Sequence, residues 1–143
     1  MKTKLGSNTA KESRKITKKY LEELWKEVIK KRAGYKSELS GIEGKQIGGN
    51  ESITAHHIVG KKTDALRFLE LDNGICLVNG SEHIFGVHNK FDPAKAKRVS
   101  DLIIEKIGTK RYEKLLLMRK QCSKKKTDLM AAKIFLQQEL QRN

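Results

Sequence analysis

Apolar residues recur every three to five positions over the first part of the chain. From Thr9 to about residue 33 they form one stripe, and lysine and glutamate fill most of the other positions. This pattern predicts an amphipathic helix whose apolar side faces a core, with Gly34 just beyond its end. The stripe consists of Ile16, Tyr20, Leu21, Leu24, Trp25, Val28 and Ile29.

Helical periodicity returns after residue 91. Asp92 and Pro93 suit the N-cap and the first position of a helix. A second helix is predicted to begin near Thr109. A third is predicted over residues 127–140, after a polar break at residues 123–126.

The middle of the chain has a different pattern. Residues 35–50 are rich in glycine and are predicted as loop. Residues 52–59 and 75–78 are predicted as short strands, joined by a loop over residues 60–71. A brief helix bearing His83 is expected after the second strand. A chain of 143 residues without internal repeats is therefore predicted to be a single α+β domain that is predominantly helical.

Charge narrows the class of partner. There are 31 Lys and Arg residues against 17 Asp and Glu, a formal net charge of +14. This excess favours a polyanion, and DNA in particular. No apolar run reaches the roughly 18 residues that a membrane span needs, so no membrane association is expected.

Cysteine usage bears on the compartment. Cys76 and Cys122 are isolated and suggest no disulfide framework, and the lysine-rich N-terminus lacks the apolar segment of a signal peptide. An intracellular location is expected. Cys76, within a predicted strand, is expected to behave as a small buried hydrophobe.

All four histidines lie in the central segment. His56 and His57 are adjacent, and His83 and His88 follow. Imidazole is a common metal ligand and a base with a pKa near neutrality. Consecutive strand residues point to opposite sides, so one of the first pair can face a metal and the other a substrate. Residues five apart on a regular α-helix lie about 140° apart, so joint use of the second pair requires the helix to end or distort near Gly86.

Three motifs in this segment resemble the HNH endonucleases of the ββα-metal type, especially small phage-type HNH proteins. The motifs are AHHIVG, LRFLELDNGICL and SEHIFGVH. The resemblance implies a ββα-metal core over residues 50–91, between an N-terminal helix over 9–33 and a C-terminal helical extension over 92–143. If the chain is phage-encoded, its location would be the cytoplasm of the host cell.

The resemblance also implies roles for individual residues. His56, His83 and His88 would hold one divalent metal ion, for which Mg, Mn, Ni and Zn remain open. His57 would be the general base for phosphodiester hydrolysis, and its second ring nitrogen needs an acceptor such as a backbone carbonyl. Asn73 would hold the connecting loop in place.

The connecting loop and the flanking segments add further expectations. Lys61, Lys62 and Arg67 are expected to contact phosphates near the cut. Many HNH proteins carry two C-x-x-C knuckles that bind a structural zinc. The corresponding positions here are Ser37, Ser40, Val78 and Ser81, so no structural zinc is expected there.

Two other functions stay open at this stage. The four histidines would instead hold a closed structural zinc in a DNA-binding module that does not cut, or they would be incidental in a basic scaffold or RNA-associated protein. An open coordination position distinguishes the nuclease from the first of these. The second predicts no metal dependence and a steeply salt-sensitive affinity. A homodimer through the apolar C-terminal helices is also open.

Overall fold

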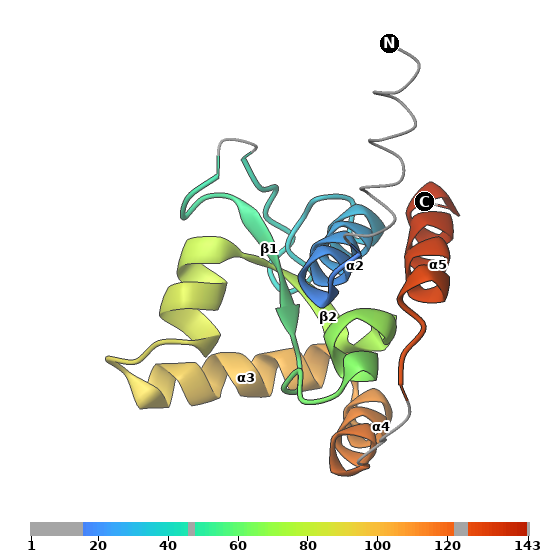
Figure 1. Cartoon of the computed structure of the whole chain (residues 1–143). Coiled ribbons are helices and arrows are strands. Elements are labelled where there is room, and N and C mark those ends of the chain that lie inside the picture. Colours follow the sequence, from blue (N-terminus) through green and yellow to red (C-terminus); the bar gives the residue numbers. More distant parts are fainter. Residues whose placement is uncertain (1–15, 46–47, 122–125, 143) are drawn as a thin grey trace.

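The computed structural model describes residues 16–45, 48–121 and 126–142 (Figure 1). Helices predominate around one small antiparallel sheet, so the chain is α+β. Residues 9–15 of the first predicted helix and residues 123–125 of the polar break lie outside the described residues. In chain order the elements are α2 (Lys18–Arg32), β1 (Ile53–His57), η1 (Ala65–Leu69), η2 (Leu71–Asn73), β2 (Gly74–Val78), η3 (Asn79–Val87), α3 (Pro93–Ile107), α4 (Thr109–Lys120) and α5 (Leu129–Arg142).

Helix α2 begins and ends at the residues that its sequence favours. The Thr17 hydroxyl accepts a hydrogen bond from the backbone N–H of Tyr20 at 3.1 Å, which satisfies one free donor of the first turn. Basic residues fill the last turn, and Gly34 follows with a φ of +66°. The predicted stripe supplies the buried face, which includes Leu21, Trp25, Val28 and Ile29.

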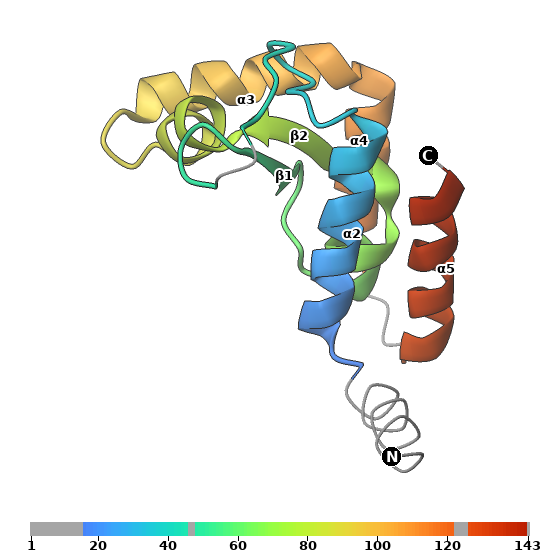
Figure 2. The ribbon, with the colours of Figure 1, turned by 90° about the horizontal axis from the view of Figure 1, so that it is seen from above.

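The two strands pair with His57 opposite Gly74 and Ile53 opposite Val78. Every residue of β2 is buried, because alternate side chains enter two different clusters. Cys76 packs with α2 and α5 on one face of the sheet, whereas Ile75 and Leu77 pack with α3 on the other. Figure 2 shows α2 and α3 on different sides of the strands. Successive residues of β1 therefore also alternate between the α2 side and the α3 side of the sheet.

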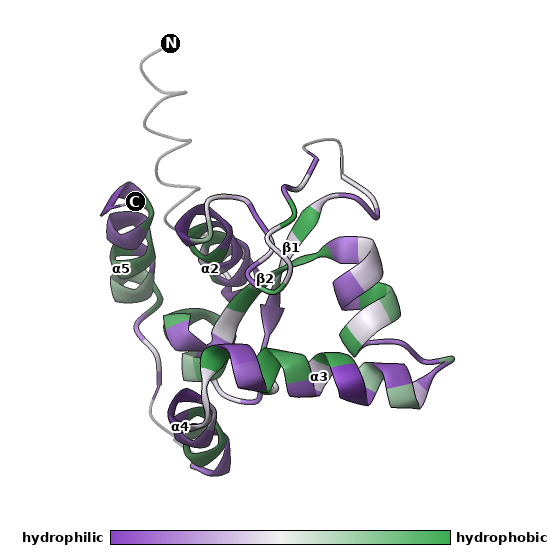
Figure 3. Ribbon diagram, turned by 180° about the vertical axis from the view of Figure 1, so that it is seen from behind, coloured by the Kyte–Doolittle hydropathy of each residue, from purple (hydrophilic) through white to green (hydrophobic). Residues whose placement is uncertain are grey.

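The C-terminal helices cover the core from outside. Ala132 and Leu136 of α5 belong to the same buried cluster as α2, and the Lys31 ammonium donates a hydrogen bond to the Leu140 carbonyl at 2.7 Å. Hydrophobic and hydrophilic residues alternate along α3 (Figure 3), as expected for a helix that packs on a sheet with one side. Part of the apolar surface of the C-terminal segment therefore serves the core of this chain.

A hydrogen-bond network joins the segment after α2 to the end of β2. The Ser37 hydroxyl donates to a Glu82 carboxylate oxygen at 2.6 Å, and the Val78 N–H donates to the same oxygen at 2.7 Å. The N–H groups of Leu39 and Ser40 donate to the Ser37 hydroxyl. Where the HNH resemblance would place two zinc knuckles, polar side chains and backbone groups thus make direct contact. Within the described residues, no helix combines the length and apolarity needed to cross a bilayer.

Candidate metal centre and general-base site

Three histidines converge between β1 and η3. The ring centroids of His56 and His83 lie 5.3 Å apart, those of His56 and His88 5.0 Å, and those of His83 and His88 4.6 Å. One nitrogen from each ring lies within 4.8 Å of the other two. The structure therefore brings together the three histidines that the sequence indicated as metal ligands.

The geometry of η3 makes this convergence possible. It is a π-helix, and the His88 N–H donates to the His83 carbonyl at 2.9 Å, an i→i+5 hydrogen bond. Residues five apart thus lie one turn apart on the same side, whereas a regular α-helix would separate them by about 140°. Gly86 allows the tight packing, because a Cβ there would lie 2.9 Å from the Ser81 carbonyl oxygen.

The rings of His56 and His83 are suited to be neutral metal ligands. Burial, reinforced by the neighbouring histidines, lowers the pKa of His56 to about 3. Burial and His88 lower the pKa of His83 to about 4. The Nδ1 atom of His83 is buried and has no hydrogen-bond partner among the described residues. Because an unpaired buried polar atom is costly, this arrangement fits a site completed by a cation.

His57 faces the other side of β1. Its ring stacks on Trp25 of α2, with centroids 4.2 Å apart and planes 8° apart. Its Nε2 lies 2.8 Å from the Arg67 carbonyl oxygen. A carbonyl only accepts, so in the neutral ring Nε2 carries the hydrogen and Nδ1 presents a free lone pair. Burial lowers the pKa of His57, which keeps the ring neutral near pH 7.

Asn73 is fully buried behind the loop that connects β1 to β2. Its amide nitrogen donates to the carbonyls of Val59 and Leu66 at 3.2 and 2.8 Å, and its amide oxygen accepts from the Val59 N–H at 2.9 Å. Asn73 therefore ties both ends of the connecting loop together. The carbonyl that binds His57 belongs to Arg67, the residue after Leu66, so Asn73 acts next to the group that orients the base.

Two arginines far apart in the sequence, Arg32 and Arg111, hold the start of β2. Arg32 of α2 donates to the Gly74 carbonyl at 2.9 Å, and Arg111 of α4 donates to that same oxygen at 3.0 Å. A Cβ at Gly74 would lie 2.5 Å from the Ile29 side chain and 2.9 Å from Trp25, so only glycine fits against α2. No periodicity in the sequence marks Arg32 or Arg111, and sequence analysis missed both.

The loop cations predicted to contact phosphate are not all free. Lys61 and Arg67 bind opposite oxygens of the Glu22 carboxylate at 2.6 and 2.7 Å. Glu22 is buried; burial alone raises its pKa, but the hydrogen bonds from the two cations outweigh this and the pKa falls to about 2. Lys62 is exposed and has no ion pair within the described part of the chain. Glu22, which sequence analysis also missed, therefore neutralises much of the positive charge beside His57.

Lys26 of α2 lies within electrostatic range of histidines on both faces of β1. Its positive charge lowers the pKa of both His57 and His83, although burial is the larger cause in each case. Its ammonium lies 3.5 Å from Glu23 and 3.9 Å from Glu22, and its side chain is only partly exposed. One helix thus supplies Lys26, Glu22 and the stacking indole to this region.

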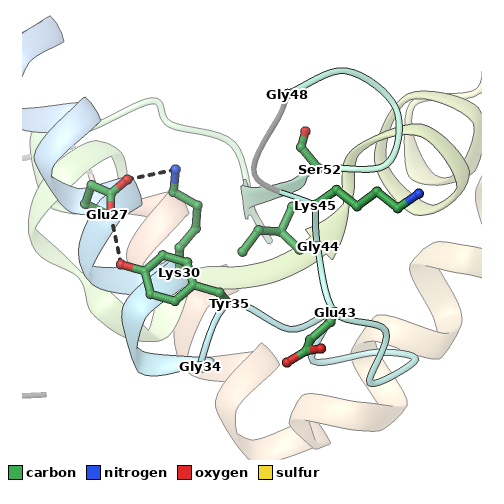
Figure 4. Close-up of a pocket in the computed structure, with 10 residues that line it drawn as sticks. Glu27, Lys30, Gly34, Tyr35, Glu43, Gly44, Lys45, Gly48 and Ser52 are labelled. Atoms are coloured by element: carbon green, nitrogen blue, oxygen red, sulfur yellow. Dashed lines mark hydrogen bonds and ion pairs between the residues drawn. The ribbon is translucent and has the colours of Figure 1, made fainter.

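An open hollow on the surface is lined by residues other than the histidines. It is formed by the end of α2, the following loop and the start of β1, as Figure 4 shows. Its principal polar groups satisfy one another, since Glu27 accepts from the Tyr35 hydroxyl at 3.4 Å and pairs with Lys30 at 2.9 Å. None of the site residues predicted from the sequence lines this hollow.

No family model, no curated protein and no solved structure matches this chain. A functional assignment therefore rests on the geometry above and on the three sequence motifs.

Proposed function

We propose that this protein is a metal-dependent DNA endonuclease of the HNH type. The observation that carries the proposal is the pair of opposite faces of β1. One face presents a neutral imidazole with a free Nδ1, and the other presents three converging imidazoles. A general base and a cation site are the two groups that metal-assisted hydrolysis of a phosphodiester needs.

His57 carries out the proton transfer in this proposal. Its Nδ1 removes a proton from a water molecule that attacks phosphorus, while the Arg67 carbonyl keeps Nε2 protonated and the ring oriented. The imidazolium that forms is stabilised by that carbonyl and by the nearby Glu22 carboxylate, both of which raise the pKa of His57 against the effect of burial. The indole of Trp25 restricts the ring to one plane.

His56, His83 and His88 would hold the cation. When bound, a divalent metal supplies Lewis-acid stabilisation of the scissile phosphate and of the leaving oxygen. Three protein ligands leave a coordination position for the substrate, as in catalytic rather than structural zinc sites. Three imidazole nitrogens suit Zn and Ni better than Mg and Mn, which prefer oxygen ligands.

The alternative is a DNA-binding module with a closed structural zinc. It needs a fourth ligand, and His57 is engaged with Trp25 and the Arg67 carbonyl on the opposite face. No other His, Cys, Asp or Glu joins the three histidines in the group of possible ligands found among the described residues. This favours the nuclease over the binding module.

The test is cleavage of supercoiled plasmid by metal-stripped protein, with Mg²⁺, Mn²⁺, Ni²⁺ or Zn²⁺ added back in turn. We expect metal-dependent nicking or linearisation. His57→Ala is expected to abolish cleavage and to keep both metal affinity and DNA binding. His83→Ala is expected to lose metal affinity. Tight metal and DNA binding without cleavage under any of these conditions would support the binding module instead.

A further inference from the structure

One aromatic side chain is exposed to an unusual degree. Phe91 is 93% exposed, whereas the next most exposed large hydrophobic residue among those described, Leu117, is 59% exposed. Burying a phenylalanine side chain stabilises a protein by about 1.5–3 kcal/mol, so its complete exposure forgoes that gain. Single exposed hydrophobic residues are common on protein surfaces, so the backbone and the charges around Phe91 decide whether it has a binding role.

The loop that carries Phe91 is held by hydrogen bonds. The Asn89 amide oxygen accepts from the N–H groups of Phe91 and Asp92, both at 2.9 Å, and its amide nitrogen donates to the Phe85 carbonyl at 2.9 Å. Asp92 in turn caps α3 by accepting from the Lys95 N–H at 3.0 Å. The ring is therefore presented to solvent by a fixed backbone. Figure 1 shows this link between η3 and α3 projecting from one end of the molecule.

Phe91 also lies close to the candidate metal centre. It follows His88 by three residues, and three residues of extended chain span at most about 11 Å. Successive nucleotides of a strand are about 3.4 Å apart. The backbone of Phe91 therefore lies no farther from that of His88 than about three nucleotides span along a duplex.

The charge around Phe91 indicates the kind of partner. Lys90, Lys97 and Arg98 are exposed nearby in the sequence, and among the described residues Lys97 pairs only with Asp101 of its own helix. The carboxylate of Asp92, the other acidic group close by, is used in the helix cap. An exposed aromatic ring with exposed cations near it in the sequence suits a nucleic-acid strand, whose bases stack and whose phosphates are anionic.

We propose that Phe91 stacks on an unpaired base, so that the site selects DNA with unpaired nucleotides beside the scissile phosphate. This inference rests on the proposal that DNA is the substrate. Stacking of a base on an aromatic side chain contributes about 1–3 kcal/mol. Insertion into an intact duplex first costs a few kcal/mol of unstacking, which a bulge, flap or single strand does not require.

The experiment measures DNA binding by the metal-stripped protein, so that no cleavage occurs. One probe is a short DNA duplex, and the other is the same duplex with a bulge that contains 2-aminopurine. We expect the protein to bind the bulged DNA about 5- to 100-fold more tightly and to quench the probe by stacking. Phe91→Ala should lose both effects, and Phe91→Trp should keep them. Phe135→Ala, which removes a phenylalanine on α5, is the matched control and should behave as the wild type.

Equal affinity of Phe91→Ala and wild type for bulged DNA would overturn the inference. So would a Phe91→Ala variant that loses affinity equally for the bulged and the intact duplex. Its failure is distinguishable from failure of the nuclease proposal. A Phe91-dependent preference without metal-dependent cleavage retains the inference and removes the nuclease. Metal-dependent cleavage without a Phe91-dependent preference retains the nuclease proposal and removes the inference about Phe91.

Discussion

The imidazole of His57 lies flat against the indole of Trp25, with ring centroids 4.2 Å apart and planes 8° apart. The indole is itself fixed, because its Nε1–H donates to the Glu70 carbonyl at 3.1 Å. The proposed base is therefore oriented by two contacts, the stack on Trp25 of α2 and the hydrogen bond that its Nε2–H donates to the Arg67 carbonyl. Both contacts restrict rotation of the ring, and neither of them involves its Nδ1.

Removal of the stack should slow cleavage without affecting the metal site. In Trp25→Leu we expect a loss of about 10- to 100-fold in cleavage rate, because small misplacement of a catalytic group costs rates of that order. The affinity of the three-histidine cluster for Ni²⁺, measured by titration calorimetry, should stay the same. Trp25→Phe keeps an aromatic ring and is the control. A leucine variant that cleaves at the wild-type rate would show that the stack has no part in orienting His57.

Loss of the Asn73 side chain should destabilise the fold. Asn73→Ala leaves the buried N–H of Val59 and the Leu66 carbonyl without partners, and we expect a loss of about 2–4 kcal/mol in the free energy of unfolding. Urea denaturation measures this loss. Asn79→Ala removes one exposed side-chain hydrogen bond to Gly49 and should cost well under half as much. Equal costs for the two variants would contradict the role given to Asn73.

The metal-stripped protein should lose stability as the pH falls from 6.5 towards 5. The ordinary pKa of histidine is 6.5, whereas burial lowers the pKa of His56 to about 3 and that of His83 to about 4. In this range the unfolded chain binds protons that the folded chain does not, so acidification favours unfolding. His56 alone should contribute about 1–2 kcal/mol by pH 5. Urea denaturation over this pH range is the measurement, and His56→Asn should flatten the dependence. A wild-type stability that is constant between pH 7 and 5 would refute the prediction.

Neutralising Glu22 should change the pH dependence of cleavage. Burial lowers the pKa of His57, and the Glu22 carboxylate partly offsets this by stabilising the imidazolium. In Glu22→Gln the pKa of His57 should therefore fall further, and the acid limb of the rate profile should move to lower pH. Affinity for DNA should rise, because Lys61 and Arg67 lose their anionic partner.

The matched control for this change is Glu23→Gln, which removes an exposed carboxylate one position away on the same helix. It should leave the acid limb unchanged. An unmoved limb in Glu22→Gln would mean that this carboxylate does not influence the base.

Local sequence patterns predicted much of the fold. Helix α3 begins at Pro93 with Asp92 as its cap, as predicted, because the signals for a helix start are local. The strands over 53–57 and 74–78 also agree with their patterns to within two residues at all four ends. The short helices η1, inside the predicted loop over 60–71, and η2, at its end, were not predicted, since segments of three to five residues carry too few positions to show a period.

The candidate site was predictable only where it depends on sequence order. Adjacent His56 and His57 face opposite sides because strand residues alternate. The supporting contacts of Glu22 and Arg111 join residues 37 to 45 positions apart. Such pairs depend on how the helices pack, and no local pattern encodes that packing.

The i→i+5 hydrogen bond between His83 and His88 has a consequence for how such sites vary among proteins. An i→i+4 bond encloses one residue fewer, so loss of a single residue between these histidines would convert the π turn to an α turn and still leave both rings on one side. Histidine spacings of four and five are thus interchangeable through a change of helix type. A search pattern with one fixed spacing would separate proteins whose metal-binding geometry is the same.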